Sequence, residues 1–343
     1  MCCHTVGGVD REEKQIMVRK FSYGDVERIT ALWNRRAVRD GFVGHTPESF
    51  SALFLKNGYF SCEHTFILEE PDGLGFVCGC TGDDLPAGHE RGYFTCLVLD
   101  DAVDTPQNTH LLMSYLEKSF LDAGKRISDI LFFNPIHLPW YIPGTDGHQH
   151  NNAPGVATDT MLYERLLDCG YLERTRECAM YLNLEGYSTP DWVKEKYNAL
   201  QKQGYHISVF NPVQCFGLTE MLDELKNPIW KKEIEESVEK GIPFLTADFE
   251  GKVVGFAGPV YPEKTGRGYF AGIGVIPSFE GKGLGTQLFY ALCSLEKEMG
   301  AAYMSLFTGE NNPAKKIYAG AGFTPVRSFA IMRRELKGAN EDA

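Results

Sequence analysis

A glycine-rich turn between an apolar run and an amphipathic helix constrains this chain more than any other feature. The apolar run covers residues 270–276, and Gly281, Gly283 and Gly285 follow it at alternate positions. A helical pattern with one leucine-rich face then begins at Leu284. Strand, glycine turn and helix direct free backbone N–H groups and the positive end of the helix dipole at one point. The segment therefore predicts an anion site suited to a pyrophosphate, because glycine has no Cβ to block close approach or forbid a positive φ.

The turn matches neither of two common phosphate loops. A Walker loop has four residues between its first glycine and a Gly-Lys-Ser/Thr end, and residues 281–286 lack this spacing. A dinucleotide fingerprint reads Gly-x-Gly-x-x-Gly and needs an acidic residue about 20 residues later, and residues 281–286 do not fit this pattern either. On the turn alone, a tight connection without a ligand stays open as the alternative.

A second pattern follows the first. Residues 303–308 are typical of a buried strand, and residues 311–323 are typical of a short helix that ends at a glycine. Asn312 is a good N-cap, and Pro313 is a good first helical residue.

These two motifs resemble those of the GNAT acetyltransferase superfamily, and the resemblance covers roughly residues 205–336. The family pattern is Val-x-Pro, then Arg/Gln-x-x-Gly-x-Gly/Ala, a strand, and Asn-x-x-Ala-x-x-x-Tyr-x-x-x-Gly-Phe. This chain has Val275-Ile-Pro277, Glu280 through Gly285, and Asn311 through Phe323. Glu280 departs from the usual Arg or Gln, but a cradle of backbone amides does not depend on that side chain.

The resemblance implies that acetyl-CoA binds in a gap between two splayed central strands, and that no metal takes part. Main-chain groups would contact the pantetheine amide and the thioester carbonyl, and one N–H would stabilise the oxyanion. The Lys282 ammonium would add charge near a phosphate or stay solvated, and Asn311 would contact the pantetheine arm or cap the helix. The implied cofactor-binding residues are Ile273, Gly274, Val275, Gly281, Lys282, Gly283, Leu284, Gly285, Thr286 and Asn311.

Tyr318 matches the family tyrosine that protonates the leaving CoA thiolate, so it is the implied catalytic residue; the alternative is a core aromatic. The general base is open. A primary amine with a pKa of roughly 10 must lose a proton before it attacks, and Leu306 stands where relatives often have a glutamate. The candidates are Tyr269, Ser305, Thr308, Glu310 and a water chain.

The length of 343 residues predicts two domains, and the first half resembles a degenerate copy of the second. We expect an α/β fold (α+β, with mixed sheets) of two tandem GNAT-like domains, each a mostly antiparallel central sheet flanked by helices. The expected division is a flexible N-terminus at 1–14, a degenerate GNAT-like domain at 15–186, a linker helix at 187–204, a GNAT acetyltransferase domain at 205–337 and a flexible tail at 338–343.

The loop of the first half that corresponds to the glycine turn is acidic. It carries Asp100, Asp101 and Asp104 and has no glycine before the helix. Three carboxylates would repel a pyrophosphate, so we expect the first domain neither to catalyse nor to bind CoA by that route.

Residues 134–158 form an unusually long insertion, and a loop of this length inside a compact domain is normally functional or disordered. Trp140 and Tyr141, between prolines, favour an ordered loop. His148 and His150, near Asp146, have a spacing that suits a metal, but the lack of a third strong ligand favours a polar surface loop.

Composition bounds the remaining possibilities. A net charge of −12 argues against nucleic acid and weakly favours a cationic acceptor. The chain has neither a run of about 18 apolar residues nor a signal-peptide pattern, and its ten cysteines are scattered. We expect a cytoplasmic protein with free thiols, a monomer or homodimer, and no membrane partner.

The function that these observations favour is acetyl-CoA-dependent N-acetyl transfer, an acyltransferase reaction that moves a group other than aminoacyl. The amine of a small molecule or peptide would attack the thioester directly in a ternary complex, in the C-terminal domain. One alternative is a non-catalytic module that binds or senses an acyl-CoA or a metabolite. Another is a purely structural pair of domains that binds no CoA.

We expect the 134–158 loop to reach the C-terminal active site and to shape the acceptor pocket. Deletion of residues 144–154 should then raise the Michaelis constant for the acceptor, which steady-state kinetics measures. Unchanged acceptor Michaelis constants would contradict this role.

Overall fold

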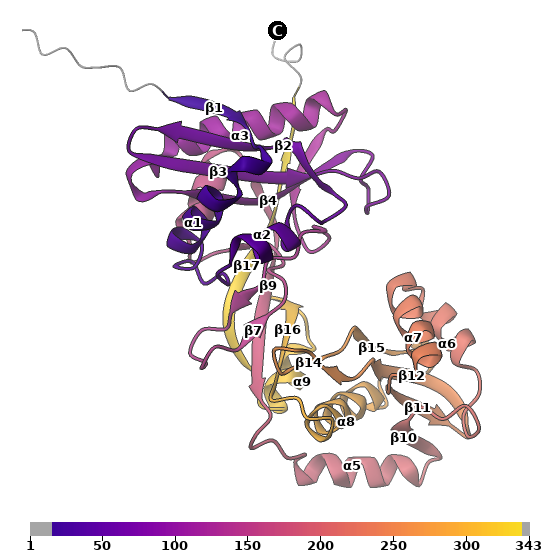
Figure 1. Cartoon of the computed structure of the whole chain (residues 1–343). Coiled ribbons are helices and arrows are strands. Elements are labelled where there is room, and N and C mark those ends of the chain that lie inside the picture. Colours follow the sequence, from indigo (N-terminus) through magenta and orange to yellow (C-terminus); the bar gives the residue numbers. More distant parts are fainter. Residues whose placement is uncertain (1–15, 338–343) are drawn as a thin grey trace, which may run out of the picture. The chain divides into compact units, whose positions relative to one another are not determined.

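The computed structural model describes residues 16–337 and divides the chain into two compact units (Figure 1). Unit 1 holds the described residues up to 140, residues 151–176 and those from 329 on, whereas unit 2 holds residues 141–150 and 177–328. The expected flexible ends, 1–14 and 338–343, lie outside the described residues.

Unit 1 is built on one sheet with the order β1-β2-β3-β4-β5-β17, and β8 also pairs with β17. All of its pairs are antiparallel except β4 with β5. The strands are β1 (Met17–Lys20), β2 (Phe60–Glu70), β3 (Gly73–Cys80), β4 (Arg91–Leu99), β5 (Ile127–Ile130), β8 (Val156–Ala157) and the end of β17 (Thr324–Glu335). The helices are η1 (Tyr23–Asp25), α1 (Val26–Arg36), α2 (Pro47–Leu53), η2 (Asp101–Val103), α3 (Pro106–Asp122) and α4 (Met161–Asp168).

Two apolar cores cover the two faces of this sheet. One joins α3 and α4 to the sheet, and the other joins α1 and α2 to it. Local chemistry sets the starts of α2 and α3: the hydroxyls of Thr46 and Thr105 accept the amides of Ser49 and Asn108, and a proline follows each threonine.

Unit 2 contains two sheets. The first has the antiparallel order β10-β11-β12-β15, and in the second β16 lies between β9 and β14. The strands are the end of β9 (Leu172–Asn183), β10 (Tyr205–Val209), β11 (Leu245–Phe249), β12 (Lys252–Gly258), β13 (Tyr261–Pro262), β14 (Arg267–Tyr269), β15 (Gly272–Val275) and β16 (Tyr303–Gly309). The helices are α5 (Asp191–Gln201), α6 (Leu218–Leu225), α7 (Pro228–Lys240), η3 (Pro277–Phe279), α8 (Leu284–Glu298) and α9 (Lys315–Gly320). Apart from these two sheets, the short strands β6 (Trp140–Tyr141), where the chain passes from unit 1 to unit 2, and β7 (Gln149–His150) pair with each other.

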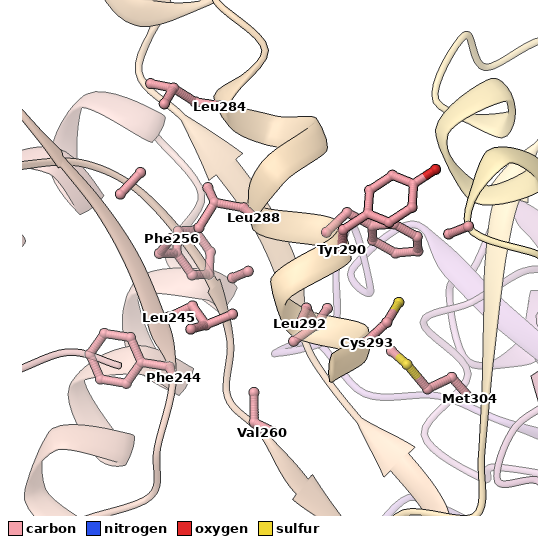
Figure 2. Packing of buried hydrophobic residues seen from close by; sticks show 14 of the residues in the cluster. Phe244, Leu245, Phe256, Val260, Leu284, Leu288, Tyr290, Leu292, Cys293 and Met304 are labelled. Carbon is pink, nitrogen blue, oxygen red and sulfur yellow. The ribbon is translucent and has the colours of Figure 1, made fainter. Parts of the chain in front are cut away.

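The core of unit 2 forms around α8. The leucine stripe predicted from the sequence is buried, and Leu284, Leu288 and Leu292 pack in the same cluster as Phe256 and Leu245 from the first sheet (Figure 2). Burial of these side chains fixes the rotation of α8 and therefore the direction of its first turn.

Each unit also contains a strand from the other half of the sequence. Residues 332–335 of β17 pair with residues 127–130 of β5 in unit 1, and residues 177–183 of β9 pair with β16 in unit 2. The sequential domains expected at 15–186 and 205–337 do not include this exchange. Alternation of apolar residues marks a strand but does not identify its ladder partner.

The predicted mixed α/β class with mostly antiparallel sheets is confirmed. β5 ends at Ile130, and the apolar residues Phe132 and Phe133 that follow it are exposed. An apolar run alone does not show where ladder pairing stops.

Glu296 is an unusual core residue of α8. Its side chain is fully buried, and neither carboxylate oxygen has a hydrogen-bond partner among the described residues. A Cβ on Gly268 of β14 would lie 2.7 Å from its Oε2 atom. In unit 1 a Cβ on Gly92 of β4 would likewise meet the ring of Phe120, on α3. Unit 1 therefore holds an apolar side chain at the place where unit 2 holds the Glu296 carboxyl.

Burial raises the pKa of Glu296 to about 9, so the folded protein keeps this carboxyl protonated at pH values where the unfolded chain ionises it. Stability is then lost as pH rises from the unfolded pKa of 4.5 toward the folded value, by at most about 1.4 kcal/mol per pH unit. Relative to wild type, Glu296→Gln should gain thermal stability between pH 5 and pH 8.

Melting temperatures of the two proteins at both pH values measure this effect. Glu298→Gln, on an exposed residue of the same helix, is the matched control and should change little. A Glu296→Gln variant whose stability relative to wild type does not depend on pH would show that this carboxyl ionises in the folded protein.

Candidate functional site

A bent strand covers residues 267–275, is interrupted at 270–271, and overlaps the apolar run predicted at 270–276. Its first part, β14, pairs in parallel with β16 only at Arg267 with Tyr303 and at Gly268 with Met304. Its second part, β15, pairs with β12 instead. Within the described part of the chain, β16 pairs only with β9 beyond Met304. The two central strands therefore diverge from Ser305 onward, as expected for a splayed gap.

The phase of the β12–β15 ladder decides which main-chain groups face the gap. Main-chain groups alternate in an antiparallel ladder, and the Ile276 N–H donates to the Val254 carbonyl at 3.0 Å. The groups of Ile273 and Val275 therefore face away from β12. Those of Gly274 face toward it, and Gly274 also leaves room for Leu225 of α6, which would lie 2.7 Å from a Cβ. Ile273 and Val275 are therefore oriented to contact a ligand through the backbone, whereas Gly274 is not.

The amides of the glycine turn are unpaired, as a pyrophosphate site requires. Gln287 is the first residue of this region whose N–H is bonded inside the helix, to the Gly283 carbonyl. Within residues 16–337, no acceptor takes the amides of Gly281, Lys282 or Gly283. Leu284, Gly285 and Thr286 form the first turn of α8, where N–H groups have no intrahelical partner.

Two of the three glycines are required by the backbone, and the third is not. Gly281 and Gly283 have φ values of 74° and 87°, a region that other residues avoid. Gly285 has no positive φ, and a Cβ there would meet nothing within 4 Å. Its open surroundings fit a ligand that approaches the helix start closely. All four residues from Glu280 to Gly283 are exposed, so the turn is open to solvent.

Tyr318 lies on α9 and packs against α8. Its ring centroid is 4.8 Å from that of Phe289 and 6.4 Å from that of Phe323. The side chain is half-buried, and burial raises its pKa. The Tyr318 hydroxyl has no hydrogen-bond partner in the described part of the chain. A phenol that remains protonated at neutral pH and is not engaged elsewhere is suited to donate a proton.

The structure separates the roles of two neighbouring asparagines. Asn312 Oδ1 accepts the Ala314 N–H at 2.9 Å, and α9 begins at Lys315 rather than at Pro313. Asn312 therefore forms the turn that precedes the helix. The exposed side chain of Asn311 takes no part in this cap, which leaves the pantetheine contact as its predicted role.

The candidate bases differ in their surroundings. Tyr269 stacks on Tyr261 with a centroid separation of 4.9 Å, and burial raises its pKa to about 12. The hydroxyls of Ser305 and Thr308 are buried without a partner among the described residues. Glu310 is exposed.

Residues 141–150 of the long loop belong to unit 2 and lie against β16. The His148 ring stacks on that of Tyr303 at 3.9 Å, and its Nδ1 atom is 2.9 Å from the Tyr181 hydroxyl. His150 is buried, with its ring centroid 4.3 Å from that of Phe307. The two histidines therefore pack against β9 and β16, whereas Gly144, Asp146 and Gly147 of the same loop are exposed, as expected for a surface loop. In the described chain, no group of three His, Cys, Asp or Glu residues is placed to hold a metal ion.

In unit 1 the acidic loop after β4 is neutralised by arginines. Arg35 pairs with Asp100 at 3.0 Å, Arg39 pairs with Asp101 at 2.7 Å, and Asp104 pairs with both Arg36 and Arg165 at 3.0 Å. These ion pairs occupy the region that corresponds to the glycine turn of unit 2. The loop of unit 1 therefore differs from that turn by its arginine–aspartate pairs as well as by the repulsion of a pyrophosphate by its carboxylates.

The gap of unit 1 is also occupied. β4 and β5 pair only from Arg91 to Tyr93 and then separate, but the Asn134 amide donates to the Phe94 carbonyl at 2.9 Å. Ile136 and Leu138 are buried in the same region. A cavity of about 50 Å³ is left between the strands, far less than a pantetheine arm needs.

A comparison with protein families finds a match in the C-terminal half of the chain. Residues 214–323 match the model of the acetyltransferase (GNAT) family. The matched region contains the gap, the glycine turn and Tyr318. No curated protein matches the sequence significantly. None of the helices between residues 16 and 337 is both long and apolar enough to cross a bilayer.

Several solved structures have the same fold as nearly the whole of this chain. A GCN5-related N-acetyltransferase from Sphaerobacter thermophilus aligns with a TM-score of 0.61 at 14% identity, over 94% of this chain and 96% of that one. A tandem GNAT protein from the clavulanic acid biosynthesis pathway aligns with a TM-score of 0.55 at 13% identity, over 95% and 100%.

A third structure contains the same fold within a longer protein. It is a glucosamine N-acetyltransferase region of a fungal multi-domain β-N-acetylglucosaminidase, with a TM-score of 0.65 at 14% identity. The alignment covers 96% of this chain but only 40% of that one.

Gly285 offers a test of the loop that separates ligand binding from folding. Gly285→Val should fold normally, because its Cβ meets no atom, but should block the approach of a pyrophosphate. At a CoA concentration 100 times its Kd, the wild type should gain about 2.7 kcal/mol of stability, which a thermal shift measures, and the variant should gain much less.

Gly186→Val is the matched control, because Gly186 also has open surroundings and no positive φ. An equal CoA-induced shift in wild type and Gly285→Val would place the pyrophosphate elsewhere.

Proposed function

We propose, since residues 214–323 match the model of the acetyltransferase (GNAT) family, that unit 2 transfers an acetyl group from acetyl-CoA to an amine acceptor. The observation that carries this proposal is the convergence of unpaired amides at residues 281–286 beside the open edge of β15. A diphosphate at the turn and an extended arm along β15 have the relative placement that acetyl-CoA needs.

The backbone would supply most of the binding and polarisation. The outward-facing groups of Ile273 and Val275 can bond the pantetheine amides and the thioester carbonyl. A fixed N–H at the carbonyl oxygen stabilises the negative charge that develops when the amine attacks. Because both reactants are held together, direct attack needs no nucleophilic side chain and no metal.

Tyr318 would act as the acid. Expulsion of the thiolate is easier when a proton reaches the sulfur, and burial favours the protonated phenol. Its packing on Phe289 holds the ring along α8, the helix whose first turn would bind the pyrophosphate.

Unit 1 would neither catalyse nor bind CoA in the corresponding gap. Its arginine–aspartate pairs and the Asn134 side chain support this assignment. The acceptor would be the amine of a small molecule or peptide, handled in the cytoplasm by a monomer or homodimer without nucleic acid or membrane.

A non-catalytic acyl-CoA or metabolite sensor is the alternative. Two features favour it: Leu306 is buried where relatives often have a catalytic glutamate, and Glu280 replaces the usual Arg or Gln. Thiol release from acetyl-CoA with a panel of amines separates the two functions, because a sensor binds CoA without turnover.

Substitution of Tyr318 tests the acid role. Tyr318→Phe should lower kcat by about 10²–10⁴-fold, the usual contribution of a positioned acid, while the Kd for CoA stays nearly unchanged. Tyr205→Phe, which removes the hydroxyl of another buried tyrosine in unit 2, is the control. Loss of CoA binding with intact turnover would contradict the role given to Tyr318.

A further inference from the structure

We propose that His148, carried into unit 2 by the 134–158 loop, is the general base of the acetyl transfer and that Tyr181 positions it. This inference rests on the proposed transferase function and supplies the group that motif comparison leaves open. It also assigns a purpose to an insertion that the two family motifs do not include.

The first step of the argument is where the gap opens. β14 and β16 are last paired at Gly268 with Met304, so Ser305 is the first residue of β16 that faces the opening. The residue directly opposite Ser305 on β9 is Tyr181. Paired residues of an antiparallel ladder project to the same face, so Tyr181 and Ser305 lie side by side at the narrow end of the gap.

The second step is which face this is. Met304 and Leu306 belong to the core that contains α8, together with their partners Leu182 and Met180. Side chains alternate along a strand, so Tyr303, Ser305 and Tyr181 occupy the face opposite α8. Tyr318 packs on the α8 side, through Phe289. A base on one face and an acid on the other suit an attack in which the proton leaves on one side and the thiolate on the other.

The third step is how firmly His148 is held. Its ring stacks almost parallel on Tyr303, with an interplanar angle of 9° and a centroid distance of 3.9 Å. The Tyr303 hydroxyl donates to the Gln149 carbonyl at 2.7 Å, and the Gln149 N–H donates to that hydroxyl at 2.9 Å. These bonds fix the backbone beside His148. The ring is thus pre-organised rather than held at the tip of a free loop.

The hydrogen bond of His148 engages Nδ1 and leaves Nε2 open. Nδ1 is 2.9 Å from the Tyr181 hydroxyl. The proposed role requires the tautomer in which Nδ1–H donates to that oxygen; the lone pair is then on Nε2, which has no hydrogen-bond partner among residues 16–337. The ring is only partly buried. This is the arrangement of a base oriented by a second group, and histidine is the side chain that most often serves as a general base.

The other candidates are weaker bases. The Tyr269 phenol has a pKa of about 12 and would have to ionise first. The hydroxyls of Ser305 and Thr308 are not basic at neutral pH, and Leu306 has no titratable group. Glu310 lies after the end of β16, at the far end of the gap from Tyr181. Tyr181 itself has a pKa raised by burial, so it remains a neutral partner for Nδ1.

The proton inventory balances with one base and one acid. An acceptor ammonium gives one proton to Nε2 of His148, which later passes it to solvent. The amine nitrogen forms the C–N bond to the thioester carbonyl carbon, and the C–S bond breaks. The sulfur takes a proton from the Tyr318 hydroxyl, and the second proton lost by nitrogen restores that hydroxyl through solvent. The products are the amide, CoA thiol and one released proton.

The experiment compares full-length wild type with His148→Ala, using acetyl-CoA and an amine that the wild type acetylates. We expect His148→Ala to lower kcat by about 10²–10⁴-fold, with the Kd for acetyl-CoA unchanged as evidence that unit 2 is folded. Added imidazole should restore part of the lost rate, which a merely structural role would not allow. Tyr181→Phe should lower kcat without raising the acceptor KM, because its ring remains.

His206→Ala, on an exposed histidine of β10, is the matched control and should keep wild-type activity with no response to imidazole. A His148→Ala variant with wild-type kcat, or with a lost rate that imidazole does not restore, would overturn the assignment of the base while leaving the transferase function intact. A wild type that binds CoA but acetylates no amine would overturn the transferase function and, with it, this inference.

Discussion

The divergence of β15 from β16 is the constraint on which the rest of unit 2 depends. Because the bent strand exchanges its partner from β16 to β12 within a few residues, main-chain groups on both sides of the gap lose their ladder partners. Unpaired backbone groups are costly when buried, so such a gap is stable only if solvent or a ligand satisfies them. The same bend aims β15 at the glycine turn, whose amides are also free.

The two units show how one framework can keep or lose such a site. Arg91-Gly-Tyr-Phe94 of β4 recurs as Arg267-Gly-Tyr-Phe270 at β14, and both strands separate from their parallel neighbour within this motif. In unit 1, the Asn134 amide donates to the freed carbonyl of Phe94, and arginine–aspartate ion pairs lie where unit 2 has free amides. In unit 2 these groups stay unpaired, and a carboxyl at Glu296 replaces the aromatic packing of Phe120.

Much of the site could be predicted from sequence because it is built from local backbone geometry. Gly281 and Gly283 adopt the positive φ values that their residue type favours, and α8 begins where its leucine pattern begins. The family motif placed Tyr318, and the structure adds its half-buried setting beside Phe289. The contribution of the long loop was harder to see. His148 reaches Tyr181 and Tyr303 through contacts between residues 33 and 155 positions apart, and no local pattern records such a pairing.

The sequence by itself determined the local elements: the glycine turn, the amphipathic rotation of α8, the acidic loop after β4 and the mixed α/β class. Each follows from the conformational preferences of nearby residues or from the period of apolar side chains. The tertiary structure alone decided which strands pair, and so placed residues 177–183 beside β16 and residues 332–335 beside β5. Backbone hydrogen bonds are chemically alike at every residue, so the choice of partner depends on packing of the whole chain.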